Sequence, residues 1–305
     1  LVAQGLPIEV LFAADAQYLR HTAVAMSSLL RSNPERFQRL WLATFEPDSA
    51  EVWALRDFLL EAYGVSLSVL GVGSEQFSGL FTSGHISREA YLRFCVADYL
   101  PETIRAVLYL DSDVLVLRRI GGLDNIVNSQ KFAEVPLMAV PTETGSHLRR
   151  LGFKSNHYFN SGVLLINLEI WRQGRLSERL MNRARSLGKS VTMHDQDVLN
   201  LEFEGNWAIL PREYNETRLT SRSNRARIVH FVGVLKPWMY GNRHPYRSEY
   251  WALDRLSPFR VAHPIGLGTY LTKKLIPRRL RRMPKALGIR GRKAYRMFRR
   301  GIEFR

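Results

Sequence analysis

Residues 8–13 read Ile-Glu-Val-Leu-Phe-Ala and residues 106–110 read Ala-Val-Leu-Tyr-Leu, the second run ending directly before Asp111. Short apolar runs of this kind are typical of strands buried on both faces of a parallel sheet. Segments with helical spacing of apolar residues alternate with such runs up to residue 70. This order predicts an α/β fold with a Rossmann-like, mostly parallel sheet flanked by helices, whose ligands bind at the carboxyl ends of the strands.

The other elements are predicted from the same patterns. Further strands are expected at residues 40–45, 65–70, 137–140, 163–167 and 227–231. Helices are expected at residues 22–30, 50–63, 88–99, 177–187 and 196–203. Gly64 follows the second of these helices, in the position where a left-handed residue commonly ends a helix.

The composition places the chain among globular proteins. It has 305 residues, 46% of them hydrophobic and 11% aromatic, which excludes disordered and collagen-like classes. No apolar run approaches the ~18 residues that a membrane-spanning helix needs, and the first residues lack the pattern of a secretory signal. The single cysteine, Cys95, fits a reducing compartment. We therefore expect a soluble intracellular protein, with one large α/β domain and an appendage or with two modest domains.

The net charge of +16 is concentrated at the C-terminal end. Residues 273–305 contain fourteen Lys and Arg against one acid, Glu303, which is a net charge of +13 and leaves +3 for the rest. The basic character thus belongs to a tail, and the body is nearly neutral. The expected domains are one α/β domain at residues 1–264 and a basic amphipathic tail at residues 265–305.

Several familiar enzyme motifs are absent from the sequence. Ala13-Ala14-Asp15 follows the first strand where a dinucleotide-binding protein has its glycine-rich turn, and no phosphate-binding P-loop motif occurs. Zinc-protease, serine-hydrolase and paired-cysteine motifs are also missing. The remaining candidate chemistry depends on carboxylates.

Asp111-Ser112-Asp113 directly follows the apolar run at residues 106–110. Side chains two apart on an extended segment face the same way, so both carboxylates are expected to converge on one site. Two buried acids repel unless a cation neutralises them, and Mg²⁺ and Mn²⁺ prefer oxygen ligands. The alternative is a solvated turn, but the apolar residues on both sides favour the metal site.

His230 ends another apolar run and is followed by Gly233 and Lys236. An imidazole suits Mn²⁺ and completes a set of ligands with the two acids. Gly233 permits a close backbone approach, and Lys236 beside Pro237 suits a phosphate contact. The alternative for His230 is a core histidine with ordinary hydrogen bonds.

Two further polar segments have a functional and a structural interpretation. Asp195-Gln196-Asp197 opens a predicted helix, where acids commonly serve as caps. Asn160-Ser161-Gly162 precedes a predicted strand, where Asn and Gly commonly form a turn.

Six segments in this order resemble glycosyltransferase family 8, particularly the bacterial enzymes that add galactose or glucose to lipopolysaccharide or lipooligosaccharide. They are FAAD-Q-Y (12–18), HIS--AYLRF (85–94), LYLDSDVLV (108–116), YFNSGVLLINL--W (158–171), DQDVLN (195–200) and HFVG--KPW (230–238). The resemblance implies a GT-A fold, a UDP-hexose donor and a retaining transfer to a saccharide acceptor.

The resemblance also implies roles for individual residues. The Mn²⁺ (or Mg²⁺) ligands are Asp111, Asp113 and His230. The donor-binding residues are Ala13, Ala14, Asp15, Gln17, Tyr18, Arg93, Ser112, Ser161, Gly233 and Lys236. The residues beside the transferred sugar are Asn160, Asp195 and Gln196. His85 and His194 are placed on the acceptor side by analogy.

Retention of configuration has two explanations. In the first, a nucleophile forms a covalent intermediate, with Gln196 or Asp195 as candidates. In the second, the acceptor attacks the sugar from the same face from which the leaving group departs. Gln196 is a poor nucleophile and Asp195 is expected to bind sugar hydroxyls, so we favour same-face attack with a phosphate oxygen as base.

The tail combines basic residues with aromatics. On a helix, Tyr295, Phe298 and Ile302 share one face and most of the arginines lie elsewhere, which suits an anionic membrane surface. This favours a peripheral protein at the inner face of the cell membrane with a lipid-linked acceptor. The alternatives are a merely solvated tail, a nucleic-acid-binding arm and a non-catalytic sugar-nucleotide or glycan-binding module. The nearly neutral body and the carboxylate site argue against nucleic acid.

Overall fold

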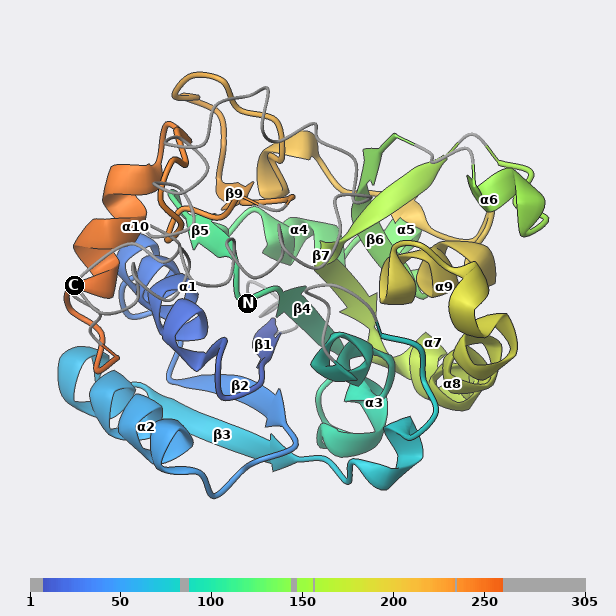
Figure 1. Ribbon diagram of the computed structural model, residues 1–305, viewed down its shortest axis with the longest axis horizontal. Helices are drawn as coiled ribbons and strands as arrows, with labels where there is room; N and C mark the ends of the chain where they lie inside the picture. The colour runs from blue at the N-terminus through green and yellow to red at the C-terminus, as the bar shows by residue number, and fades with distance from the viewer. Residues whose placement is uncertain (1–7, 83–87, 144–146, 156, 234, 260–305) are drawn as a thin grey trace, which may run out of the picture.

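The computed structural model describes residues 8–82, 88–143, 147–155, 157–233 and 235–259. A seven-stranded sheet in the order β3-β2-β1-β4-β7-β6-β8 forms its centre (Figure 1). Its strands are β1 (Glu9–Ala13), β2 (Arg39–Thr44), β3 (Ser66–Gly71), β4 (Ala106–Leu110), β6 (Leu137–Thr142), β7 (Tyr158–Asn167) and β8 (Ala208–Ile209). The pairs formed by β7 with β4 and with β6 are antiparallel, and the other neighbouring pairs are parallel. The predicted α/β fold with a mostly parallel sheet is confirmed.

Ten α-helices and a small second sheet complete the described part of the chain. The second sheet pairs β5 (Val114–Val116) with β9 (Ile228–His230). The longer helices are α1 (Leu19–Ser32), α2 (Ala50–Tyr63), α7 (Leu168–Gln173), α8 (Leu176–Leu187), α9 (His194–Glu202) and α10 (Arg247–Asp254). The short ones are α3 (Val96–Tyr99), α4 (Leu123–Val127), α5 (Gln130–Ala133) and α6 (His147–Arg150). Four 3₁₀-helices lie at Glu75–Phe77, Arg88–Phe94, Gly188–Ser190 and Arg212–Tyr214.

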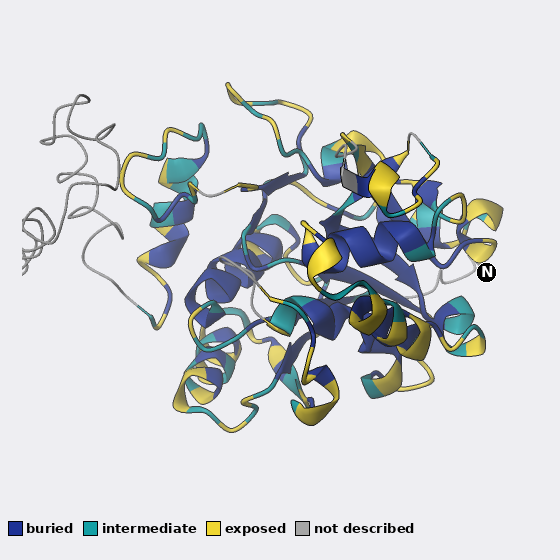
Figure 2. Ribbon diagram, turned by 45° about the vertical axis from the view of Figure 1, so that its right-hand side comes forward, coloured by how far each residue is buried: buried dark blue, intermediate teal, exposed yellow. Residues whose placement is uncertain are grey.

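The central sheet is covered by helices on both faces. Alternate residues of β4 point to opposite sides, so Leu108 packs in the core beneath α1 and α2, whereas Tyr109 packs in the core beneath α7, α8 and α9. The central strands β1, β4 and β7 are accordingly buried along most of their length, whereas β3 and β8 at the edges of the sheet are partly exposed. Buried strands lie at the centre of the molecule, and exposed residues lie on helices and loops around them (Figure 2). Burial on both faces is the physical reason for the continuous apolar runs in the sequence.

One predicted helix has a different form. Residues 88–99 are a 3₁₀-helix at Arg88–Phe94 followed by the single-turn α3, rather than one α-helix. Tyr91 to Phe94 are all buried, so this segment is packed between the sheet and α8 and has no solvent face there. Tertiary contacts on all sides override the α-helical preference of the sequence.

The direction of β7 places its first residues at the functional edge of the sheet. Because β7 runs antiparallel to β4, with Leu110 opposite Val163, its beginning lies beside the carboxyl end of β4. Asn160, Ser161 and Gly162 therefore lie within a strand, and the alternative of a turn is wrong.

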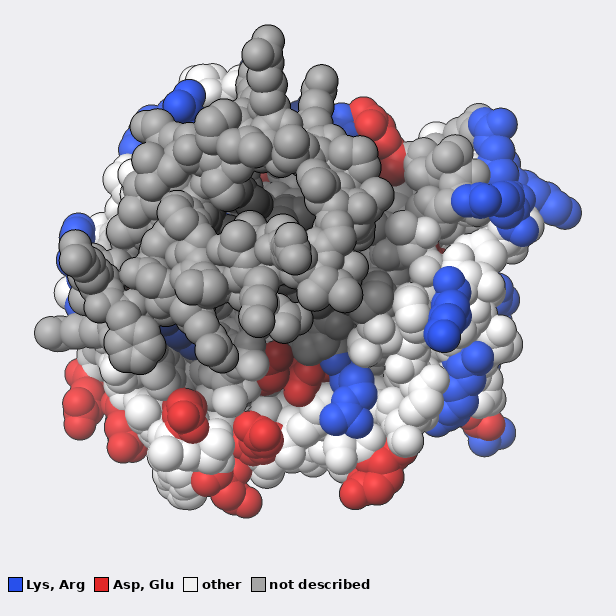
Figure 3. Space-filling model, viewed as in Figure 1, with Lys and Arg blue, Asp and Glu red and all other residues white. Residues whose placement is uncertain are grey.

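The surface of the described part carries both signs of charge. On the face in Figure 3, acidic residues gather along the lower edge near α2, and basic residues lie on the right-hand side near α6 and α8. Among the described residues, no helix has the length and apolar character to cross a bilayer. The predicted tail at 265–305, and with it the boundary after residue 264, lies outside the described residues and stays a prediction.

Candidate active site

A pocket of about 420 Å³ lies at the carboxyl edge of the central sheet. It is lined from the ends of β1 and β4, the beginnings of β7 and α9, and the segment after β9. All of the predicted site residues line it except Gln17, which is exposed beside it. His194 also lines the pocket, whereas His85 lies outside the described residues. The sequence motifs thus meet at one place in the fold.

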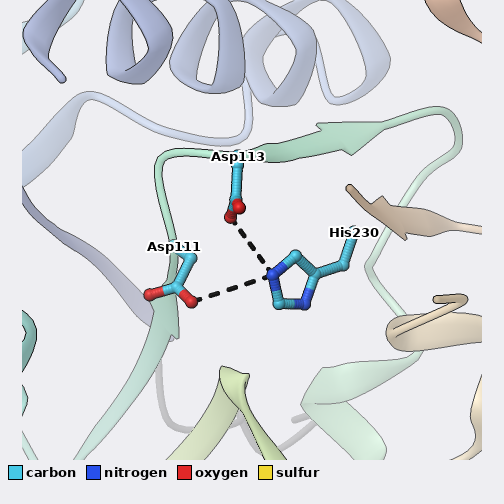
Figure 4. Close-up of side chains that lie close together, drawn as sticks. All are labelled: Asp111, Asp113 and His230. Carbon is cyan, nitrogen blue, oxygen red and sulfur yellow. Dashed lines mark ion pairs between the residues drawn. The ribbon is translucent and has the colours of Figure 1, made fainter. Parts of the chain in front are cut away.

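Asp111, Asp113 and His230 surround one point in this pocket (Figure 4). His230 Nε2 lies 3.1 Å from Asp113 Oδ1 and 3.8 Å from Asp111 Oδ2. β5 pairs with β9 so that Val114 stands opposite His230, which brings the histidine next to Asp113. The two acids lie in a turn between β4 and β5, not on one extended segment as predicted, but they still converge.

The outward oxygen of each carboxylate is held by a basic side chain. Arg93 Nη2 and the Tyr109 hydroxyl donate to Asp111 Oδ1 at 2.7 and 3.0 Å. Lys236 donates to Asp113 Oδ2. Although burial opposes ionisation, Lys236 and His230 hold the pKa of Asp113 well below its usual value. Asp111 Oδ2 and Asp113 Oδ1 remain directed at the common point.

The donor set fits a divalent cation. His230 Nδ1 lies 3.0 Å from Asn160 Oδ1, an oxygen that already accepts the Gly162 N–H, so Nδ1 carries the proton. Nε2 is therefore the ring nitrogen that faces the two carboxylate oxygens and that can bind a cation through its lone pair. Two anionic oxygens and one imidazole nitrogen form a ligand set that suits Mn²⁺.

Gly162 allows Asp111 and His230 to pack directly against the backbone of β7. A Cβ atom on Gly162 would lie 2.1 Å from His230 Cε1 and 2.7 Å from Asp111 Oδ2. Any side chain at this position displaces both candidate ligands. The glycine in the sequence motif is thus explained by a close approach and not by a turn.

We expect Gly162→Ala to remove the manganese-dependent UDP binding that the family resemblance implies, because the added methyl group pushes His230 and Asp111 apart. Calorimetry with UDP and Mn²⁺ checks this, with circular dichroism to establish that the variant is folded. Gly121→Ala is the matched control, since its methyl group meets only Arg36 Nη1 at 3.6 Å. Equal UDP affinity in Gly162→Ala and the control would contradict this account of the glycine.

Arg93 joins Asp111 to the start of α9. Its buried guanidinium donates to Asp111, lies 3.2 Å from Asp195 Oδ2 and also donates to the Ser161 carbonyl. Burial, opposed by Arg93, raises the pKa of Asp195 to about 6. The Ser161 hydroxyl donates to the same Asp195 oxygen at 3.0 Å. Asp195 is thus a buried carboxylate with two polar partners facing the pocket.

The Gln196 amide is fixed in one orientation. Its Oε1 accepts the Ser161 N–H at 3.1 Å and the Asn160 amide at 3.0 Å, and its Nε2 donates to the Tyr158 hydroxyl at 2.9 Å. By contrast, Asp197 accepts the backbone N–H groups of residues 192 and 193. The capping interpretation therefore applies to Asp197, whereas Asp195 and Gln196 line the pocket.

The end of β1 forms the opposite wall. Asp15 accepts the Tyr18 N–H at 2.8 Å and orders the start of α1. Burial, and after it Asp113, raises the pKa of Tyr18 to about 12, so its ring stays neutral. Ser112 lies beside Thr22, with 2.8 Å between the two hydroxyl oxygens. The side chains of Ala13 and Ala14 are small, so they leave space in the pocket at this wall.

Two of the residues that act here were not predicted as site residues. Tyr109 supports Asp111, and Tyr158 links Gln196 to Asp197. Each is a strand tyrosine within one of the six quoted segments, and a buried tyrosine hydroxyl needs a hydrogen-bond partner. That signal was available in the sequence.

Comparisons with known proteins agree with this arrangement. The model of the family Glycosyl transferase family 8 matches residues 9–241. General stress protein A of Bacillus subtilis is 30% identical over 275 residues, covering 80% of this chain and 92% of that protein. A lipopolysaccharide 1,3-galactosyltransferase of Salmonella typhimurium is 24% identical over 270 residues, covering 82% of this chain and 78% of that protein. The crystal structure of the galactosyltransferase LgtC with donor and acceptor sugar analogues superposes with a TM-score of 0.71 at 24% identity, covering 84% and 98% of the two chains. That likeness shows a common fold.

Proposed function

Since the chain belongs to glycosyltransferase family 8 and is thus a glycosyltransferase, we propose that it moves a hexose, galactose or glucose, from a UDP-sugar to a saccharide acceptor. The proposed transfer depends on Mn²⁺ or Mg²⁺ and retains the configuration of the sugar. The proposed acceptor is a lipid-linked saccharide of the lipopolysaccharide or lipooligosaccharide type. Lipopolysaccharide galactosyl- and glucosyltransferases among the relatives support this choice.

The observation that carries the proposal is the convergence of Asp111, Asp113 and His230 in a pocket that also contains Asp195 and Gln196. The first three side chains would hold the divalent ion. An ion bound there supplies positive charge that stabilises the diphosphate leaving group. The pocket thus offers a place for a diphosphate next to a place for a sugar.

Other residues of the pocket are proposed to bind the uridine and the phosphates of the donor. In this proposal Ala13, Asp15 and Tyr18 contact the uridine, and Gly233 and Lys236 contact the β-phosphate. Gly233 has φ +84°, which suits a glycine backbone close to a ligand. Lys236 bonds to Asp113 and to the Phe231 carbonyl, so its charge already lies at the edge of the candidate metal site. The contact of Gln17 with the donor stays a prediction.

Retention by same-face attack is supported by the state of the two possible nucleophiles. The Gln196 oxygen accepts two hydrogen bonds, which lower its availability for attack on the anomeric carbon. Asp195 is held by Arg93 and Ser161. Both groups are therefore better suited to orienting the sugar than to forming a covalent bond with it.

Donor hydrolysis tests the proposal directly. A panel of UDP-sugars is incubated with the full chain and Mn²⁺, and the anomer released first is identified by NMR. We expect UDP-galactose or UDP-glucose to be hydrolysed with the α anomer appearing first. A first product in the β configuration contradicts retention, and failure to bind any UDP-sugar contradicts the proposed donor.

The location of the enzyme is part of the same proposal. We place it at the cytoplasmic face of the cell membrane, where a lipid-linked acceptor is accessible, with residues 265–305 in contact with anionic lipid. The net charge of +13 at residues 273–305 supports this, at ~1 kcal/mol for each basic residue near the surface.

Removal of the residues after Thr272 is expected to abolish binding to phosphatidylglycerol vesicles and to improve solubility. Binding by the full chain should weaken with salt, because the Debye length is ~8 Å at physiological ionic strength. Transfer to a soluble sugar acceptor should persist, since every proposed donor-site residue precedes Met239. Sedimentation with vesicles measures the effect. Equal pelleting of both chains contradicts the membrane proposal, and salt-sensitive retention on DNA without vesicle binding supports a nucleic-acid arm instead.

A further inference from the structure

Asn215 lies behind His230, outside the pocket lining, and is 1% exposed. It follows the 3₁₀-helix at Arg212–Tyr214. The next residue, Glu216, forms hydrogen bonds to β9 through both its backbone N–H and its carbonyl. The Glu216 N–H donates to the Ile228 carbonyl at 2.9 Å, and the His230 N–H donates to the Glu216 carbonyl at 3.0 Å. This pairing fixes the side chain of Asn215 next to the ring of His230.

The hydrogen-bond directions around Asn215 follow from two main-chain donors. The Ser161 N–H fixes Gln196 Oε1 as an acceptor, and the Gly162 N–H fixes Asn160 Oδ1 as an acceptor. Asn215 Nδ2 donates to that same Asn160 oxygen at 2.8 Å, so the remaining amide atom of Asn215 is its oxygen. Asn215 Oδ1 lies 3.2 Å from His230 Nδ1.

We propose that Asn215 is a positioning residue that holds His230 with Nδ1 protonated and Nε2 directed at Asp111 and Asp113. His230 Nδ1–H lies between two amide oxygens, from Asn160 and Asn215, and no orientation of the two amides consistent with the main-chain donors offers it a donor. The tautomer and the ring orientation are thus set from outside the ligand set. This role rests on the proposed metal site and adds a residue to it.

The effect expected from losing Asn215 is a weaker metal site. Partners that hold the second nitrogen of a ligating histidine typically contribute 10- to 100-fold in metal affinity. Asn215→Ala removes one acceptor for His230 Nδ1 and one of the two donors to Asn160 Oδ1, so the ring gains freedom to turn. We expect manganese to bind roughly 10-fold more weakly or worse.

The test measures Mn²⁺ alone, by electron paramagnetic resonance of the free ion, with full-length protein. Asn167→Ala is the matched control: Asn167 is also buried and bonds to the Phe132 carbonyl and the Ile170 N–H, remote from the pocket. A weaker affinity in Asn215→Ala with an unchanged affinity in Asn167→Ala supports the proposal. Equal affinity in Asn215→Ala and the wild type overturns it, as does an equal loss in both variants.

Nitrogen-15 NMR of the histidine side chains gives a readout that a purely structural role does not move. At a pH high enough to leave the imidazole uncharged, we expect His230 of the wild type to carry its proton on Nδ1 alone, and in Asn215→Ala we expect a population protonated on Nε2. An unchanged single tautomer overturns the proposal. If Asn215→Ala does not fold, Asn215→Ser serves in both measurements, because its hydroxyl ends where the amide carbon of Asn215 lies and leaves His230 without this acceptor.

The metal-dependent function and the role of Asn215 can be tested separately. Absence of Mn²⁺ binding by the wild type removes the proposed metal-dependent function, whereas the tautomer of His230 still tests Asn215. Normal Mn²⁺ binding by both proteins leaves the function intact and removes the role of Asn215.

Discussion

Asp113→Asn is expected to lower kcat/KM for the UDP-sugar by at least ~10³-fold, equivalent to about 4 kcal/mol of lost stabilisation. Asp113 is the acid closest to His230 Nε2, at 3.1 Å, and its other oxygen is paired with Lys236. An amide at this position removes the negative charge that attracts a divalent ion and leaves Lys236 without its anionic partner. Calorimetry with UDP in Mn²⁺ should give no measurable binding.

Asp111→Asn should act in the same direction, because Asp111 Oδ2 faces the same point while its Oδ1 is held by Arg93 and Tyr109. Asp124→Asn is the control for loss of one carboxylate, since Asp124 lies on α4 and pairs with Arg36. The circular dichroism spectra of all three variants should match that of the wild type. Undiminished UDP affinity in Asp111→Asn or Asp113→Asn would exclude these residues as metal ligands.

The second large effect is on stability and involves α10, which lies beyond the residues matched by the family. Arg20 on α1 forms a two-bond ion pair with Asp254 on α10, at 2.6 and 2.7 Å, with side chains 8% and 2% exposed. Removing one partner of a buried pair leaves an uncompensated charge. We expect Asp254→Ala to lower the free energy of unfolding by about 3–5 kcal/mol. The Tm should fall by roughly 2–4 °C for each kcal/mol lost.

Differential scanning calorimetry measures this change. Replacing both partners, Arg20→Met with Asp254→Leu, should recover most of the loss because no buried charge is left unpaired. The half-exposed pair of Arg36 and Asp124 gives the comparison, and Asp124→Ala should cost at most about 1 kcal/mol. A change in Asp254→Ala no larger than in Asp124→Ala would show that α10 is not held by its ion pair.

The same helix connects to the candidate active site. The Tyr250 hydroxyl of α10 lies 2.6 Å from His21 Nδ1, and the His21 ring stacks on Trp238 at 3.5 Å. Burial lowers the pKa of His21 to about 3, so the stacked imidazole is neutral. Trp238 follows the proposed phosphate-binding residue Lys236 by two residues. A variant that releases α10, such as Asp254→Ala, should therefore also raise the KM for the donor.

The central strands and most of the predicted site followed from local sequence patterns. Ala106–Leu110 and Ala50–Tyr63 with its Gly64 cap were predicted at the observed bounds, because an apolar run and a capped amphipathic segment carry their own signals. The family resemblance, taken from six ordered motifs, is confirmed by the family match.

Long-range relations outside the six motifs were not predicted. The antiparallel direction of β7 depends on its pairing with β4, and no local pattern specifies it. Asn215 belongs to no motif, and its role arises only because the next residue, Glu216, pairs with β9. The pairing of Arg20 with Asp254 joins positions 234 residues apart and likewise has no signal in either segment.

The most direct test of the central claim compares UDP binding by the wild-type chain in Mn²⁺ and in excess chelator. The claim is that Asp111, Asp113 and His230 bind a divalent ion that holds the diphosphate of the donor. The account predicts tight binding in Mn²⁺ and a loss of at least ~10²-fold in chelator, restored when Mn²⁺ is added back. Equal UDP affinity in Mn²⁺ and in chelator, with full transfer activity in chelator, would contradict it.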